Sequence, residues 1–175
     1  MNATHQITGQ TVPAHAVPSR RSESVDRFRV RPADVTAEGV VSGATLLDRF
    51  DHIAQRTAEQ WCGTRSVLAS VGNFHLDRPI TVGNTVEIQA NLVYTGRCSM
   101  HLLITVRVDD AVGRSHTAQI AMVFVAIDAA GTPVEVPPFT PFTMLELQRH
   151  RQARVRTRMR RRIEEAMANQ EYSPG

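Results

Sequence analysis

The chain has 175 residues, a hydrophobic fraction of 42% and a formal net charge of +3, which predict one domain with one core. No segment approaches the roughly 18 apolar residues that a membrane-spanning helix needs, so no membrane span is expected. Two cysteines make no disulfide framework and seven histidines show no ligand spacing, so we expect a cytoplasmic protein without a metal.

The N-terminal segment, residues 1–24, is rich in Thr, Ser, Pro, Gln and His. It lacks the apolar stretch of a secretory signal, and its composition predicts a disordered tail. A domain over residues 25–140 is expected to follow. It opens with Phe28 and Val30, which alternate with arginines and predict a short edge strand, and residues 32–39 then form a loop.

A long amphipathic helix is predicted over residues 43–62, with Gly63 in the position that ends helices. Its apolar stripe consists of Leu47, Phe50, Ala54, Ala58 and Trp61. Asp51 lies beside this stripe, where a carboxylate is costly unless the protein uses it, so Asp51 is the candidate catalytic acid. Asp48, one turn earlier and farther from the stripe, is the alternative.

Several strands are predicted after the helix. Alternation from Ser66 predicts a strand over residues 67–76 with a bulge near Gly72. Two longer alternating runs, residues 85–94 and 100–108, predict an antiparallel hairpin. The nearly continuous apolar run in residues 116–128 predicts a central strand buried on both faces. The expected fold is α+β, a long helix wrapped by a curved antiparallel sheet of about five strands, in a protein that is at least a dimer.

The C-terminal region, residues 141–175, carries the positive charge, with eight Arg and four acids against 12 Arg and 13 acids elsewhere. Residues 143–168 predict a charged helix. Since every basic residue is Arg, Schiff-base chemistry by a lysine is excluded. The helix lacks interleaved aromatic residues and the domain itself is not basic, so no nucleic acid is expected as a partner.

Short motifs along residues 27–138 resemble those of the hotdog-fold acyl-CoA thioesterases, in the acyl-CoA hydrolase branch. The motifs are Gly43-Ala44 followed by Asp51, Asn73 to Leu76, Pro79 to Asn84, Gly96 to Ser99, and Phe124 to Asp128. Each is weak alone, but their common order and spacing are specific.

This resemblance implies hydrolysis of acyl-CoA without a cofactor, by a dimer or a trimer of dimers. Asp51 would activate water or attack the carbonyl, and N–H groups at Gly43 and Ala44 of the partner subunit would form the oxyanion hole. Thr36 stands where many members carry an Asn that positions water. The substrate-binding residues would be Asn73, Arg97 and Ser99, with the Arg cluster 149–162 near the phosphates of coenzyme A.

Other interpretations remain at this stage. Asp51 could be a structural acid paired with an Arg across a dimer interface, and the Arg cluster could be a solvated helix face. His52 and His75 are possible acid–base groups, and both cysteines are expected to be inert. The alternative functions are acyl-CoA binding without hydrolysis, favoured by Thr36, and hydration of enoyl thioesters by His52 beside Asp51.

Overall fold

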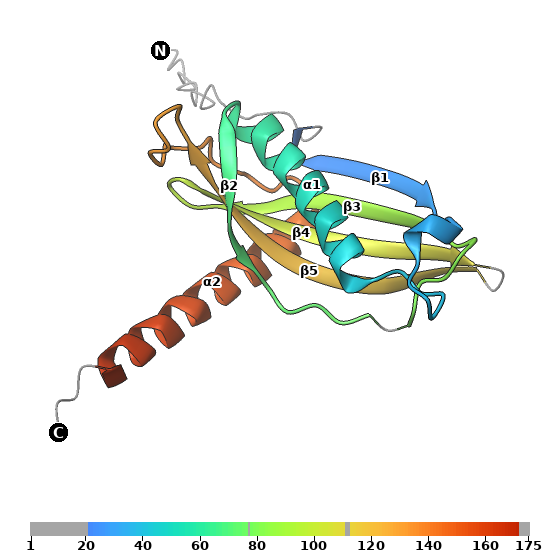
Figure 1. The fold of residues 1–175 in the computed structure, drawn as a ribbon. Coiled ribbons are helices and arrows are strands. Elements are labelled where there is room, and N and C mark those ends of the chain that lie inside the picture. Colours follow the sequence, from blue (N-terminus) through green and yellow to red (C-terminus); the bar gives the residue numbers. More distant parts are fainter. Residues whose placement is uncertain (1–20, 77, 111–112, 172–175) are drawn as a thin grey trace, which may run out of the picture.

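The computed structural model describes residues 21–76, 78–110 and 113–171 and has the predicted α+β hotdog architecture (Figure 1). Its single sheet is antiparallel, with the strand order β1-β3-β4-β5-β2. The elements are β1 (Glu23–Arg29), η2 (Pro32–Asp34), α1 (Gly43–Cys62), β2 (Arg65–Val71), β3 (Thr85–Thr95), β4 (Ser99–Asp110), β5 (Gly113–Ile127) and α2 (Met144–Glu171).

Helix α1 packs across one face of the sheet, which we call the inner face (Figure 1). Alternate residues of β3, β4 and β5 point toward it and form one core with the buried residues of α1. The buried residues of α1 are Leu46, Phe50, Ile53, Ala54, Thr57, Ala58 and Trp61. The stripe therefore begins at Leu46, which is fully buried, whereas Leu47 is only half-buried.

Both ends of α1 are capped by local sequence. Ser42 is extended, and its hydroxyl accepts a hydrogen bond from the Thr45 N–H at 3.1 Å. Gly63 adopts a left-handed conformation with φ of 72° and donates its N–H to the Glu59 carbonyl, as the sequence predicts. These two caps fix the length and phase of the helix over the sheet.

The two edges of the sheet differ in chemistry. On β1, Arg27 forms an ion pair with Glu87 of β3 at 2.8 Å, and Glu23 accepts a hydrogen bond from Gln89. On β2 the apolar residues Val67, Leu68 and Val71 are 44%, 41% and 44% exposed. The β1 edge is therefore mainly charged, although Val25 on it is 48% exposed, and the β2 edge presents three apolar side chains.

Strand β2 is shorter than predicted. It ends at Val71, and its register shifts between Leu68 and Ser70, so the bulge lies at Ala69 and not near Gly72. Beyond the strand, Gly72 approaches β5 closely and donates its N–H to the Ala121 carbonyl at 2.8 Å. The bulge thus turns the end of β2 without breaking its contact with β5.

Strand β5 is an interior strand between β4 and the edge strand β2, not the middle one, and it is not fully buried on both faces. Its inner-face residues are buried, while Ala121, Val123 and Val125 on the outer face are half-buried. The continuous apolar sequence therefore marks a strand whose outer face is only partly covered within this chain.

Helix α2 begins on the outer face of the sheet, and its C-terminal half extends away from it (Figure 1). Ala153 packs against Val93 and Leu103, and the Thr157 hydroxyl lies 3.4 Å from His101 Nδ1. Strand β1 begins at Glu23, within the segment 1–24 that composition predicts to be disordered. The rest of that prediction, residues 1–20, lies outside the described residues.

Candidate active site

The N-terminus of α1 presents unpaired backbone donors. The first N–H groups of a helix have no partner within it, and Ser42 satisfies only that of Thr45. Gly43 and Ala44 are exposed, and their N–H groups make no hydrogen bond to the described residues. Together with the positive end of the helix dipole, they can stabilise a negatively charged oxygen.

Asp51 is half-buried, and its Oδ1 is buried without a hydrogen-bond partner in the described part of the chain. Gln55, one turn later on the same side of α1, donates to the Ser66 carbonyl of β2 at 3.3 Å. Asp51 therefore faces the flank of α1 that is nearest the exposed edge of the sheet. A buried carboxylate oxygen without a partner is costly, which favours a role beyond packing.

The two groups are too far apart to serve one carbonyl within a single chain. Asp51 follows Gly43 by eight residues, which at 1.5 Å per residue separates them by about 12 Å along α1. Attacking groups and oxyanion donors must both lie about 3 Å from the reacting atoms. A shared site therefore needs two copies of the helix.

Thr36 is exposed in a turn that precedes α1. Its N–H donates to the Val40 carbonyl at 2.8 Å, and its carbonyl accepts from Gly39. A hydrogen bond from the Thr36 side chain lowers the pKa of the Glu38 carboxyl. In this chain the hydroxyl is thus engaged by its own turn.

The alternative acid–base residues lie elsewhere. Asp48 and His52 are exposed and, with Asp26 of β1, line a cavity of about 460 Å³ on the β1 side of α1. Asp51 does not line that cavity. His75 is exposed in the segment after β2. Asp51 therefore does not share this cavity with His52.

Both cysteines are free and half-buried. Burial raises the pKa of the Cys62 thiol, which disfavours the reactive thiolate at neutral pH.

The expected substrate-binding residues do not gather in one place. Ser99 lies 3.4 Å from His101 Nε2 and lines a groove of about 380 Å³ between α2 and the outer face of the sheet. Arg97 is exposed in the turn before β4 and does not line this groove. Asn73 is exposed beyond the end of β2.

Ser42 was not singled out in the sequence analysis, although a serine directly before a helical pattern is a known signal for the start of a helix.

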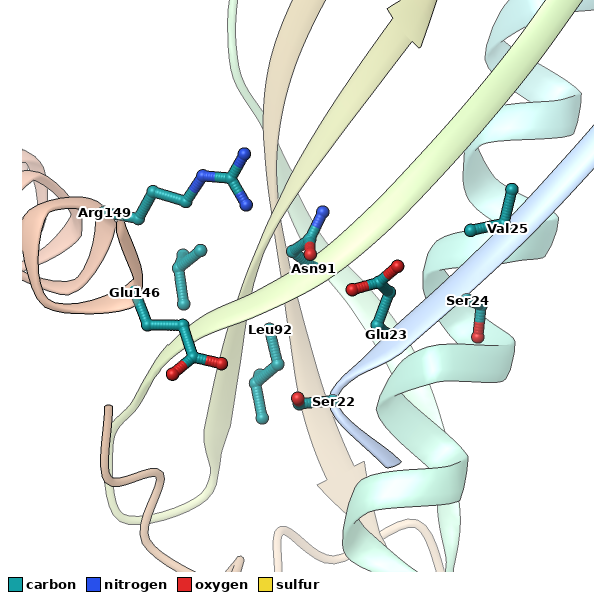
Figure 2. Close-up of a pocket in the computed structure, with 9 residues that line it drawn as sticks. Ser22, Glu23, Ser24, Val25, Asn91, Leu92, Glu146 and Arg149 are labelled. Carbon is teal, nitrogen blue, oxygen red and sulfur yellow. The ribbon is translucent and has the colours of Figure 1, made fainter. Parts of the chain in front are cut away.

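A further cavity, of about 530 Å³, lies between β1, β3 and the first turns of α2 (Figure 2). Figure 2 shows the side chain of Asn91 between those of Arg149 and Glu23. Asn91 is 8% exposed, and its Nδ2 has no partner among the described residues. Glu146, which also lines the cavity, accepts hydrogen bonds from two N–H groups and caps α2. None of the expected catalytic residues lies here.

In the described ranges, no cluster of three or more His, Cys, Asp or Glu side chains could hold a metal ion. No helix within those ranges is long and apolar enough to cross a membrane.

The helix, the sheet order and the curvature define a hotdog protein, and comparison with known proteins agrees. Residues 38–113 match the thioesterase superfamily. The chain is similar to the acyl-CoA thioester hydrolase YciA of Escherichia coli, with 30% identity over 128 residues, which are 70% of this chain and 96% of YciA. It is 29% identical over 155 residues to the uncharacterized acyl-CoA thioester hydrolase YkhA of Bacillus subtilis, covering 86% and 90% of the two chains.

Solved structures give the same result. An acyl-CoA hydrolase from Staphylococcus aureus, solved with butyryl coenzyme A and coenzyme A, superposes with a TM-score of 0.77 at 29% identity, over 87% of this chain and 96% of that one. A hexameric acyl-CoA thioesterase superposes with a TM-score of 0.80 at 29% identity, over 85% and 96%. The chain belongs to the hotdog-fold thioesterase superfamily and is a homologue of its acyl-CoA thioester hydrolases.

Proposed function

We propose that this protein hydrolyses acyl-CoA thioesters to a free acid and coenzyme A, with Asp51 as the catalytic carboxylate. The observation that carries the proposal is the buried Oδ1 of Asp51, which has no partner in the described chain, on a helix whose N-terminus has unpaired donors. Acyl transfer needs both a base or nucleophile and a site for an oxyanion.

In the simplest sequence, Asp51 accepts a proton from a water molecule whose oxygen attacks the thioester carbonyl carbon. The carbonyl oxygen becomes negatively charged and is held by the N–H groups of Gly43 and Ala44 from the partner subunit. The C–S bond then breaks, and the proton passes from Asp51 to the departing thiolate. In the nucleophilic variant, Asp51 attacks the carbonyl carbon itself, and the C–S bond breaks with loss of the coenzyme A thiolate. Water then hydrolyses the resulting mixed anhydride, which regenerates the Asp51 carboxylate, and the proton it releases passes to the thiolate.

The spacing of residues studied in a relative supports this choice of acid. In the S. aureus hydrolase, alanine variants have been characterised at an aspartate, at an asparagine 15 positions before it and at a threonine 17 positions after it. Counted from Asp51, the same spacings fall on Thr36 and Leu68. This spacing supports Asp51 as the counterpart of that aspartate, with a threonine and a leucine at the two other positions.

We further propose that the site forms between two copies that associate at the β2 edge. The edge offers exposed Val67, Leu68 and Val71, and Asp51 faces the same flank. Relatives that assemble as hexamers are compatible with a trimer of such dimers.

The direct test is release of free thiol from a panel of acyl-CoAs. Asp51→Ala should abolish turnover while thermal unfolding stays close to that of the unmodified protein, because the carboxylate makes no hydrogen bond in the described chain. Asp48→Ala, an exposed acid one turn away on the same helix, is the matched control and should keep its activity. Turnover that survives Asp51→Ala would rule out this mechanism.

A second candidate function is acyl-CoA binding without hydrolysis. It is favoured by Thr36, which stands at the spacing of the relative's asparagine and whose hydroxyl hydrogen-bonds Glu38. It is also favoured by Leu68, an apolar residue at the spacing of the relative's threonine. Calorimetric binding of acyl-CoA measured beside thiol release separates the two. Tight binding with no release from any acyl-CoA would favour the binding protein.

A further inference from the structure

Helix α2 carries an apolar stripe that the rest of the described chain leaves uncovered. The stripe consists of Val155, Met159, Ile163 and Met167, which are 51%, 60%, 60% and 63% exposed. Residues four positions apart lie on one side of a helix. The half of α2 that bears the stripe extends away from the sheet (Figure 1), so the stripe faces solvent in the single chain.

A different side of α2 contacts the sheet. Ala153 is buried against the outer face, and the Thr157 hydroxyl lies 3.4 Å from His101 Nδ1. Burial, and then the positive charges of Arg160 and Arg161, lower the pKa of His101 from 6.5 to about 4. Because Ala153 and Thr157 hold this side of α2 on the sheet, the stripe is turned away from it.

Arginines border the stripe on both sides. At about 100° per residue, Arg156 and Arg160 lie along the border nearer the sheet, where they also line the groove beside β5. The other border carries Arg151, Arg158 and Arg162. All five are exposed, and no glutamate lies within the stripe. An apolar side between rows of guanidinium groups is typical of a helix that lies on an anionic lipid surface.

The spacing of the stripe favours a lipid surface over a second helix. A step of four residues turns by about 400°, so each stripe residue is displaced by about 40° and Val155 lies about 120° from Met167. A seam between two helices needs alternating steps of three and four, which keep its residues in line. Two α2 helices packed stripe to stripe would also place their arginine borders side by side, and like charges repel.

We propose that α2 docks this protein on the surface of an anionic phospholipid membrane. The stripe would enter the boundary between headgroups and acyl chains, and the bordering arginines would contact lipid phosphates. The helix would lie in the plane of the membrane with the sheet on its aqueous side, as the contacts of Ala153 and Thr157 require. This docking does not depend on the proposed hydrolysis.

Binding to vesicles tests the proposal. The full chain should co-sediment with phosphatidylcholine vesicles that contain about a third phosphatidylglycerol, and should dissociate as salt is raised from about 0.1 M to about 1 M. Met159→Gln/Ile163→Gln should weaken this binding about tenfold or more, because two apolar side chains no longer enter the lipid. Both positions are 60% exposed and glutamine suits a helix, so the melting curve should not change.

The matched control for the stripe lies outside α2. Val25 and Val82 are 48% and 46% exposed. Val25→Gln/Val82→Gln therefore removes two comparably exposed apolar side chains and should bind vesicles as the unmodified protein does.

A second pair of variants tests the arginine border. Arg158→Gln/Arg162→Gln should weaken binding to the anionic vesicles about tenfold or more. Arg29→Gln/Arg65→Gln removes the same charge from exposed positions in β1 and β2 and should leave binding unchanged. Equal losses in the two pairs would show that net charge, and not α2, attracts the lipid, and would overturn the proposal.

Two further outcomes would contradict the docking of the stripe. If Met159→Gln/Ile163→Gln binds the anionic vesicles as tightly as the unmodified protein, the attraction is electrostatic only. If the unmodified protein does not bind them, the proposal is wrong. Sedimentation velocity then identifies the other occupant, because smaller assemblies of the Met159→Gln/Ile163→Gln protein would make the stripe a contact between copies of this chain.

Discussion

Asp51 is a side chain whose burial is costly for folding and for which we propose a role in the chemistry. Its Oδ1 is shielded from solvent, yet the described chain offers it no donor. Conservative replacement therefore separates the two roles. With Asp51→Asn we expect kcat to fall by about 10²–10⁴-fold, and the free energy of unfolding to stay equal or rise by up to about 1 kcal/mol.

Paired measurements of thiol release and urea unfolding check this expectation. An Asp51→Asn protein that keeps its activity but unfolds more readily would make Asp51 a structural acid, as the alternative interpretation of the sequence holds.

His101 gives stability a defined pH dependence. It binds a proton near pH 6.5 in the unfolded chain and only near pH 4 in the folded one. The unfolded state thus binds more protons between these values, so the stabilisation is complete above pH 6.5 and is lost as the pH falls toward 4. The expected loss is up to about 3 kcal/mol relative to His101→Gln over this range.

Urea unfolding of both proteins at several pH values measures that loss. Carboxylates titrate in both, so the difference between the two curves reports His101. Parallel curves would show that α2 does not keep His101 neutral in solution.

Among the elements, α1 and the β3–β4 hairpin could be predicted well, because a face buried against one core imposes a period of 3.6 or 2 on the sequence. The bulge at Ala69 and the start of the stripe at Leu46 could not. Both depend on how β2 and α1 pack against residues distant in sequence. The local alternation of apolar and polar residues does not predict that packing.

The start of α1 can be altered without disturbing the fold. Gly43 is the first helical residue, a position that accepts proline, and Ser42 before it has φ and ψ of −69° and 150°, which also suit a following proline. A Cβ at Gly43 would meet nothing within 4 Å. Gly43→Pro deletes one N–H donor and should lower kcat by about 10²–10³-fold, with little change in Tm.

Gly43→Ala is its matched control, since it adds the Cβ and keeps the N–H. Thiol release by the two variants, beside their melting curves, decides the point. Equal activity would mean that the Gly43 N–H does not contact the developing oxyanion.

At the scale of the whole molecule, the sequence predicts the parts of the site better than their arrangement. Spacing singles out Asp51 and the small residues at the helix start as candidates, but the groove between α2 and the sheet joins Ser99 of β4 to α2 residues more than fifty positions later. Ser99 could be singled out from its turn, whereas its position beside Arg156 and Arg161 depends on where α2 docks, which Ala153, Val93 and Leu103 determine.

A site formed by two subunits makes a quantitative prediction about mixed assemblies. Asp51→Ala and Gly43→Pro each inactivate a different half of the site. In randomly mixed dimers of equal amounts, the subunit that supplies Asp51 is intact there with a probability of one half, and so is the subunit that supplies Gly43. About a quarter of the sites should therefore be complete. Co-expression followed by thiol-release assays of the purified mixture measures the recovery. Activity no greater than that of the separate variants would mean that each subunit contains its whole site.

The two edges of the sheet differ in charge, and this difference affects how far the sheet can be extended by further chains. A strand edge can template further strands without limit, as in fibrils. Here β1 carries the Arg27–Glu87 ion pair and other charged side chains, whereas β2 exposes Val67, Leu68 and Val71. A copy that pairs through β2 presents only its charged β1 edge outward, so continuous extension of the sheet stops after two chains. In a dimer of that kind the sheet would not extend further, and any larger closed assembly would use surfaces other than the strand edges.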